Sequence, residues 1–254
     1  MKIGILYGYQ MSDVMKKSER IRVHTPYGEI IVYFSTLGNH ELLFIQRHGE
    51  KANLPPHRIN YRGNIQALAS CHVSCVFSVG TVGSMKSAIH PGDLVIPHDF
   101  IDATKSRPLT FFEEQRVHVD MTEPFCPSLR KILLKCCKKI NNITVHDKGV
   151  YLVTEGPRLE TAAEIKLYSR VADIVGMTMV PEVVLAREKG MCFASVCLVC
   201  NKTAGLQKKL PVDEIVSVYK NKEPLISKVM QQVIWSLNEK QACDCPSEVS
   251  KAVV

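Results

Sequence analysis

The chain has 254 residues, of which 46% are hydrophobic and 22% charged, and its formal net charge is +7. This is the composition of an ordinary folded protein, and no run of about 18 apolar residues predicts a membrane-spanning helix. The basic residues are scattered and form no stripe with interleaved aromatic residues. We therefore expect neither a nucleic-acid partner nor a membrane partner.

The N-terminal segment from Lys2 to Tyr7 is apolar and ends at Gly8, which predicts a buried strand that opens into a loop. It lacks the length and the cleavage site of a signal peptide, so we expect a cytoplasmic protein. The apolar pattern then predicts a hairpin around Pro26-Tyr27-Gly28. A further strand follows over 41–45 and leads into Arg47-His48-Gly49.

The middle of the chain alternates helices and strands. The pattern predicts a helix over 59–70, strands over 73–79 and 94–97, and a helix that begins at Pro127. Gly80-Thr81-Val82-Gly83-Ser84 follows the first of these strands and predicts a glycine turn. Residues 99–126 predict a long irregular connection, which in a compact domain is usually functional.

The last third continues this alternation. Strands are expected over 149–154, 174–175 and 191–200, and Thr161-Ala162-Ala163-Glu164 is a capping box that begins a helix. Another helix begins at Pro181 and ends before Gly190. One face of the final helix carries Ile226, Val229, Met230, Val233, Ile234 and Leu237. No repeat or linker is evident, so we expect one α/β domain over 1–240 and a disordered polar tail over 241–254.

Polar clusters at the expected strand ends are candidate ligand sites. Arg47 offers a planar fork for phosphate and His48 a further donor, although Arg47 could instead form a structural pair with a carboxylate. The amides around Gly80-Thr81 could form an anion nest, or only an ordinary turn.

Three later residues have similar alternatives. The Thr178 hydroxyl could contact an anion near a helix N-terminus or could cap that helix. Met177 suits the face of a sugar ring, but it could equally fill the core. Asn201 ends a buried strand, and its carboxamide can bond both N7 and O6 of a 6-oxopurine, unless it only makes a turn.

The ten cysteines do not show zinc-site spacing. Cys71 and Cys75 have no second pair in register, and Cys192, Cys197 and Cys200 fall within an apolar strand, where cysteine usually behaves as a small buried hydrophobe. Cys243 and Cys245 are separated by one residue. They could form a disulfide, act as a redox pair or remain free thiols. We expect no metal site.

Taken in order, these clusters resemble the trimeric purine nucleoside phosphorylase and methylthioadenosine phosphorylase family, from the first strand to about residue 238. The resemblance rests on several segments that follow one another in the same order as in the family. They are Arg47-His48-Gly49, Pro55 to Asn64, Gly83-Ser84, Pro91-Gly92-Asp93, Asp99 to Asp102, Glu123 to Cys126, Glu155 to Arg158 and Met177 to Glu188.

The resemblance implies a single α/β domain with a mixed, partly barrel-like sheet, usually assembled as a trimer or a dimer of trimers. It implies that phosphate attacks C1′ of a purine nucleoside and releases the base and a ribose 1-phosphate. Inorganic phosphate is then a co-substrate, and no cofactor is needed.

The resemblance also assigns roles by position. Phosphate ligands are Gly8, Tyr9, Arg47, His48, Gly80, Thr81 and Thr178. The nucleoside is bound by Leu159, Met177, Asn201 and Thr203, and Asn201 supports N7 in the transition state. His118 matches a residue that closes the 5′ pocket of the neighbouring subunit.

Two departures from the family pattern bear on function. Adenine-preferring members have Asp-x-Asp where this chain has Asn201-Lys202-Thr203, so we expect a 6-oxopurine substrate such as methylthioinosine, inosine or guanosine. The family's Gly-Gly-Ser/Thr-Gly loop is here Tyr7-Gly8-Tyr9-Gln10. Tyr9 could bond phosphate or block it, which leaves a catalytically impaired nucleoside-binding homologue as the alternative. A nucleosidase that uses water is a third alternative.

Overall fold

The computed structural model describes residues 1–8, 18–238 and 243–253. The N-terminal third contains β1 (Lys2–Tyr7), β2 (Glu19–Thr25), β3 (Gly28–Leu37), β4 (His40–Gln46), the 3-10 turn η1 (Pro56–Arg58), α2 (Tyr61–Ser70) and β5 (Cys75–Ser84). The middle contains β6 (Leu94–Val95), β7 (Asp99–Ala103), α3 (Pro127–Cys137), β8 (Val145–His146) and β9 (Val150–Thr154). The last third contains α4 (Ala162–Tyr168), β10 (Ile174–Gly176), α5 (Met179–Glu188), β11 (Cys192–Lys202), α6 (Val212–Trp235), α7 (Cys245–Glu248) and the 3-10 turn η2 (Val249–Lys251).

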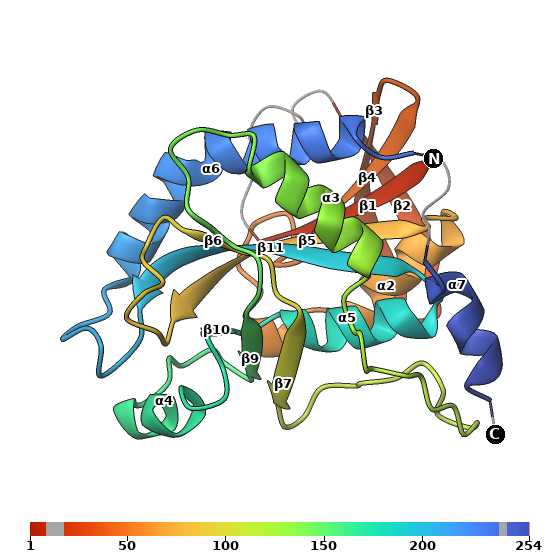
Figure 1. The fold of residues 1–254 in the computed structure, drawn as a ribbon. Helices are drawn as coiled ribbons and strands as arrows, with labels where there is room; N and C mark the ends of the chain where they lie inside the picture. Colours follow the sequence, from red (N-terminus) through yellow and green to blue (C-terminus); the bar gives the residue numbers. More distant parts are fainter. Residues whose placement is uncertain (9–17, 239–242, 254) are drawn as a thin grey trace.

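The strands form one branched, mixed sheet. Its main path runs β2-β3-β4-β1-β5-β10-β9-β7, and β11 pairs with β5 and β6, while β8 pairs with β6. The long strands β5 and β11 lie at its centre (Figure 1). The sheet and its flanking helices confirm the α/β fold that the sequence predicts.

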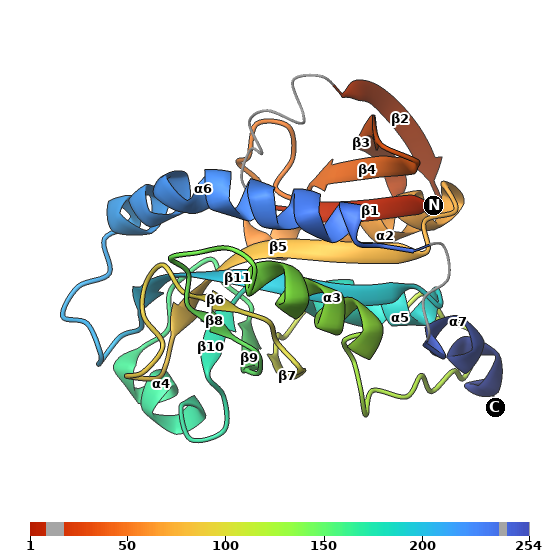
Figure 2. The same cartoon turned by 45° about the horizontal axis from the view of Figure 1, so that its top comes forward.

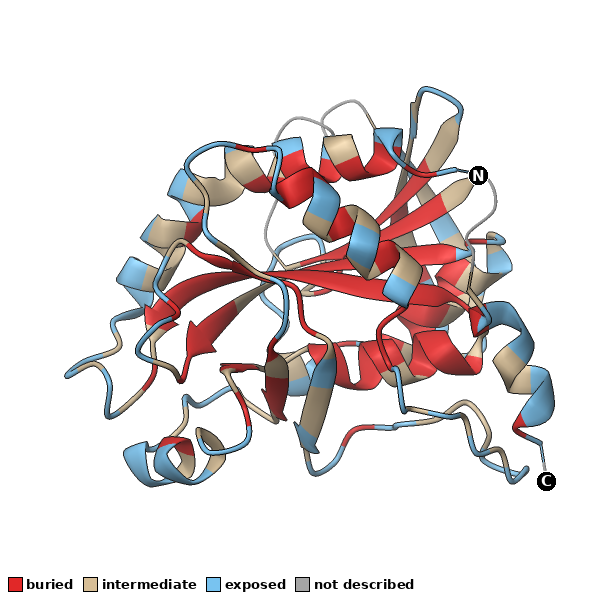
Figure 3. Cartoon of the chain, viewed as in Figure 1, coloured by how far each residue is buried: buried red, intermediate tan, exposed pale blue. Residues whose placement is uncertain are grey.

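Helices cover both faces of the sheet, as Figures 1 and 2 show. Helices α3 and α6 pack over one face and α2 and α5 over the other. Side chains of β11 alternate between the two cores: Ala194, Val196 and Leu198 face α3 and α6, whereas Phe193 and Val199 face α2 and α5. This alternation follows from the two-residue period of a strand, and it explains why β11 reads as a continuous apolar run. Burial is concentrated in this centre (Figure 3).

The sheet opens at one point along β5. On one edge, β5 pairs with β11 over its whole length. On the other edge it pairs with β1 only as far as Val79, and with β10 only from Gly83 onward. In the described part of the chain, the backbone from Gly80 to Val82 therefore has no strand beside it on that edge. Strand ends of β1 and β10 meet here, which is where an α/β sheet commonly binds ligands.

The hairpin, the capping box and the apolar face of the last helix are confirmed. Strands β2 and β3 pair across Thr25 and Gly28, and Thr161 and Glu164 exchange both capping-box hydrogen bonds. All six predicted face residues of α6 and its C-terminal extension are buried.

Three predictions about local structure are wrong. Residues 80–84 continue β5 because β11 pairs with them, so they form no turn or nest. Residues 99–103 are the strand β7, which pairs with β9, so the irregular connection begins only after Ala103. The expected disorder of the tail fails for 243–253, because this segment forms α7 and η2 and buries Cys245 and Ala252. A domain boundary at residue 240 stays a prediction.

No helix in the described ranges combines the length and the apolar character needed to cross a membrane.

Candidate functional site

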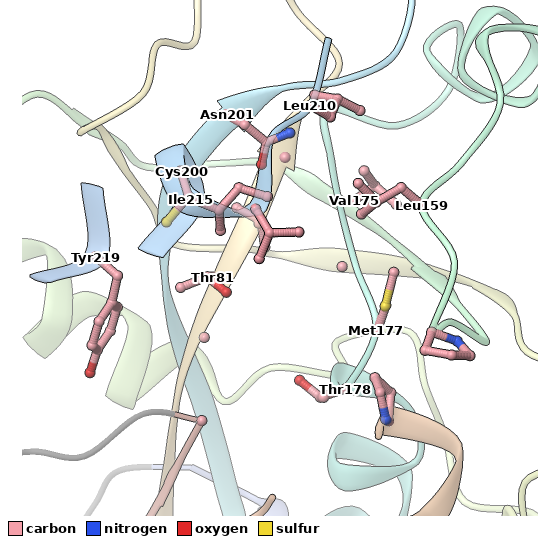
Figure 4. A pocket seen from close by; sticks show the side chains of 18 of the residues that line it. Thr81, Leu159, Val175, Met177, Thr178, Cys200, Asn201, Leu210, Ile215 and Tyr219 are labelled. Atoms are coloured by element: carbon pink, nitrogen blue, oxygen red, sulfur yellow. The ribbon is translucent and has the colours of Figure 1, made fainter. Parts of the chain in front are cut away.

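A pocket of about 350 Å³ lies at the gap in the edge of β5. Its walls come from the ends of β1, β4, β10 and β11, from the segment around Leu159, and from the start of α6. Most of the predicted ligand residues line it: Gly8, Arg47, His48, Gly80, Thr81, Leu159, Met177, Thr178, Asn201 and Thr203. Figure 4 shows the side chains of Thr178, Met177, Leu159 and Asn201 arranged around one open space.

Two predicted ligands are not brought together with these. Tyr9 lies outside the described residues, so its role stays a prediction. His118 is exposed in the connection between β7 and α3, where its amide donates to the carbonyl of Ala252 at 2.9 Å, and it does not line the pocket.

Arg47 forms a buried ion pair with Glu182 of α5. Arg47 Nε donates to one carboxylate oxygen at 2.6 Å and Nη2 to the other at 3.2 Å. Nη2 also donates to Ser78 Oγ at 2.8 Å, and Ser78 Oγ donates to Glu182 at 3.0 Å. Both charged side chains are almost completely buried, so their mutual bonds are what make the burial of either charge tolerable. This is the structural pairing that the sequence left open.

The same guanidinium also bonds the backbone at the gap in the sheet. Arg47 Nη1 donates to the carbonyl of Val79 at 2.8 Å, at the residue where β1 leaves the edge of β5. Of the five N–H donors of arginine, four are used by these partners. Nη1 lies near Gly8 at the pocket, since a β-carbon on Gly8 would be 3.5 Å from it. Arg47 therefore uses most of its donors to hold the site.

The surroundings of His48 favour the neutral ring. Its Nδ1 lies 2.7 Å from the carbonyl of Leu54, so in the neutral ring Nδ1 carries the proton and Nε2 is an acceptor. Burial lowers the pKa of His48, and the Arg47 charge adds to this, against the opposing effect of the hydrogen bond to Leu54. Nε2 lies near Gly8 at the rim of the pocket, where a hydroxyl group of a ligand can donate to it.

Thr178 stands before α5 but does not cap it. Its side chain makes no capping hydrogen bond, and Val180 has non-helical dihedral angles, so the regular helix begins at Pro181 as predicted. The hydroxyl is directed into the pocket (Figure 4). Of the two interpretations that the sequence left open, capping is wrong, and anion contact stays a prediction.

Met177 and Gly176 are held by tight packing on β10 and its continuation. A β-carbon on Gly156 would lie 2.5 Å from Met177 Sδ, and one on Gly176 would lie 2.0 Å from Tyr151 Oη. A larger residue at either position would have to displace these side chains, and the thioether lies on the pocket wall between Thr178 and Asn201 (Figure 4).

Asn201 is the penultimate residue of β11 and follows a bulge at Cys200, and its side chain lies at the pocket. Its Nδ2 donates one hydrogen to the carbonyl of Lys202 at 2.8 Å. The amide keeps a second donor hydrogen and the acceptor Oδ1. Thr203 is buried beside it, and its hydroxyl donates to the carbonyl of Ser84 at 3.0 Å, which leaves Thr203 Oγ1 as an acceptor.

Two residues that position the site were missed by the sequence analysis. Glu182 is one. Its position as a charged residue within the apolar run of α5 was the feature of the sequence that could have identified it. Lys202 is the other: its Nζ donates to the carbonyls of Lys86 and Ser87 at 2.7 and 2.8 Å, and also to that of Ile89. Lys202 thereby ties the end of β11 to the loop after β5 and holds Asn201 and Thr203 on either side of it.

The geometry agrees with comparisons to known proteins. The family model of the phosphorylase superfamily matches residues 2–234. The chain belongs to this superfamily. It is 41% identical over 256 residues to a probable S-methyl-5′-thioinosine phosphorylase of Methanopyrus kandleri, covering 100% of this chain and 99% of that protein. It is 40% identical over 247 residues to the S-methyl-5′-thioadenosine phosphorylase of Pyrococcus furiosus, covering 96% of each.

A solved structure shares the fold. A methylthioadenosine phosphorylase from an Antarctic soil metagenomic library matches with a TM-score of 0.91 at 30% identity, over 99% of this chain and 92% of that one.

The buried pair between Arg47 and Glu182 generates a stability prediction. Glu182→Ala leaves the Arg47 charge buried without its partner, so we expect the free energy of unfolding to fall by about 3–5 kcal/mol. Glu41→Ala removes an exposed partner of Lys2, at 3.2 Å, and should cost about 0–1 kcal/mol. Urea denaturation of both variants measures the difference. Equal losses in the two variants would contradict the role given to Glu182.

Proposed function

We propose that the protein catalyses the phosphorolysis of a purine nucleoside to the free base and a ribose 1-phosphate. The observation that supports this most is that one pocket is lined by Arg47, His48 and Thr178 at one end and by Asn201 at the other, with Met177 between them. We assign the first end to the anion and the second to the base. Its volume of about 350 Å³ is in the range of small-molecule sites, roughly 300–1,000 Å³. No cofactor takes part in the proposed reaction, and inorganic phosphate is the co-substrate.

The anion end would hold phosphate by neutral and charged donors together. Thr178 Oγ1, the amide of Thr81 on the open edge of β5, and Arg47 Nη1 are donors. His48 Nε2 accepts from the hydroxyl of monohydrogen phosphate, which suits its neutral ring. Phosphate held against one face of the ribose is then oriented for attack on C1′, and this orientation supplies part of the rate enhancement.

The base end would stabilise the leaving group. As the glycosidic bond breaks, positive charge develops on the ribose and negative charge on N7 of the purine. The free Nδ2 hydrogen of Asn201 donates toward this charge, and Met177 and Leu159 cover the ribose and the base. Donors that are already in place when the charge develops contribute most to catalysis.

Asn201 favours a 6-oxopurine. The free Nδ2 hydrogen can be shared between N7 and O6, which are both acceptors, whereas a carboxylate at this position accepts from a 6-amino group. Methylthioinosine, inosine and guanosine are therefore the favoured substrates, and 5′-methylthioadenosine is the less favoured one. The start of α6 lines the pocket with Val212 and Ile215, and this apolar wall suits a 5′-methylthio group better than a 5′-hydroxyl group.

We also propose that the protein is a homotrimer or a dimer of trimers. His118 lies away from its own pocket, which fits a role in closing the pocket of a neighbouring subunit. The impaired homologue is not favoured, because the similar curated proteins carry the names of working phosphorylases over nearly their full length.

The test of the proposal is a nucleoside panel with and without inorganic phosphate, with free base as the readout. We expect base release from methylthioinosine, inosine or guanosine that stops when phosphate is removed. Release that continues without phosphate would identify a nucleosidase. Failure to cleave any of these nucleosides or methylthioadenosine at high enzyme concentration would support the impaired alternative.

The role of Asn201 generates a second prediction. Asn201→Asp replaces the donor with a carboxylate that repels O6, so we expect kcat/KM for a 6-oxopurine nucleoside to fall by at least about tenfold. The ratio of methylthioadenosine to methylthioinosine cleavage should rise. Asn39→Asp, at an exposed turn, is the control for the added charge. An unchanged ratio would contradict the assignment of Asn201 to the base.

A further inference from the structure

Four cysteine thiols meet on the side of the molecule where α7 lies. Cys126 immediately precedes α3, Cys192 begins β11, and Cys243 and Cys245 come from the C-terminal segment. Their Sγ atoms all lie within 4.8 Å of one another. None of the four lines the nucleoside pocket. The cluster forms only in the fold, because its members come from three distant parts of the chain.

The spacing of the sulfur atoms suits a tetrahedral metal ion. A Zn–S bond is about 2.3 Å, which makes the edge of a ZnS₄ tetrahedron about 3.8 Å. Cys192 and Cys243 lie closer than this, at 3.2 Å, and the longest separation in the group is within 4.8 Å. The separations in the cluster therefore bracket the edge of such a tetrahedron.

The cluster is enclosed by the fold on most sides. Cys126 is the residue that precedes α3, and Cys192 is the first residue of β11. Cys126, Cys192 and Cys245 are buried, whereas Cys243 is half-buried and leaves a route for an ion to enter.

The C-terminal segment is fastened around this cluster. Glu248 forms an ion pair with the buried Arg187 at the end of α5, and Gly190 packs closely against Pro246. Farther along, the carbonyl of Ala252 accepts from the amide of His118. The segment therefore joins α3, α5, β11 and the long connection after β7, which meet at this side of the molecule (Figure 1).

The other core cysteines can be explained as small buried hydrophobic residues, but the four-cysteine cluster cannot. Cys136, Cys137, Cys197 and Cys200 lie in helix and strand interiors among apolar side chains. Cys243 and Cys245 instead come from a short polar segment, and both direct their sulfur atoms to Cys126 and Cys192. Two cysteines separated by one residue, completed by two more from the body of the protein, form a closed four-sulfur ligand set.

We propose that Cys126, Cys192, Cys243 and Cys245 form a structural Zn²⁺ site that fixes the C-terminal segment to α3 and β11. This departs from the sequence analysis, which expected no metal site. A four-thiolate site has no open coordination position, so the ion has a structural role and takes no part in phosphorolysis. Because the folded protein would bind Zn²⁺ far better than the unfolded chain, the ion should raise stability.

The test measures metal content of the full chain purified in the presence of a reductant. We expect one Zn²⁺ per chain in the parent protein and in Cys71→Ser, whose thiol lies outside the cluster. Cys245→Ser and Cys243→Ser should lose the ion. Replacement of Zn²⁺ by Co²⁺ in the parent should give the visible spectrum and the intense charge-transfer bands of tetrahedral Co²⁺–thiolate coordination, and chelation should lower the thermal unfolding midpoint.

The proposal is overturned if the fully reduced parent takes up neither Zn²⁺ nor Co²⁺. In that case, the intact mass of protein purified without reductant would show whether the cysteines form disulfides instead. Each disulfide would lower the mass by two hydrogens. Uptake of Co²⁺ without a thiolate spectrum would also overturn it. If a serine variant fails to fold, the Co²⁺ spectrum of the parent still decides, because it needs no substitution.

Discussion

The bonds from the Arg47 guanidinium are the interactions on which the site depends. Strand β5 loses β1 as a neighbour after Val79 and gains β10 only at Gly83, so the edge between them opens into a pocket. An opening in the middle of a sheet leaves backbone N–H and C=O groups without strand partners, and buried groups of this kind must be hydrogen-bonded elsewhere. Arg47 provides such a bond to the Val79 carbonyl. It also bonds Ser78, while Glu182 balances its charge. Strand β4, strand β5 and helix α5 are thereby held around a fixed opening.

The same interactions also position the rest of the pocket. Helix α5 carries Glu182 and begins just after Thr178, so the ion pair that holds the helix also places this hydroxyl. On the opposite wall, Lys202 holds the end of β11 through three carbonyl groups of the loop after β5. The residues that line the pocket thus come from the ends of several strands around β5, and they are held by the bonds of Arg47 and Lys202.

Much of the fold could be predicted from the sequence because local patterns specify it. The alternating apolar runs, the capping box at Thr161 and the spacing of Ile226 to Leu237 each depend on neighbours along the chain. The site residues of the pocket could also be predicted, since most of them stand at the ends of apolar strands. What could not be predicted depends on contacts between distant segments. The extension of β5 through Gly80 to Ser84 is imposed by β11, the partner of Arg47 lies on α5, and the tail is ordered by Arg187 and the cysteine cluster. None of these contacts leaves a periodic signal.

The central claim, that phosphate binds at the open edge of β5, is tested most directly by the phosphate KM of Gly80→Ala. A β-carbon at Gly80 meets no atom within 4 Å, so the fold and the thermal unfolding midpoint should be unchanged. The added methyl group would occupy space at the anion end of the pocket. The account predicts that KM for phosphate rises by at least about tenfold, the loss of roughly one hydrogen bond to an ion, while KM for the nucleoside changes little. An unchanged KM for phosphate in a folded Gly80→Ala protein would contradict it.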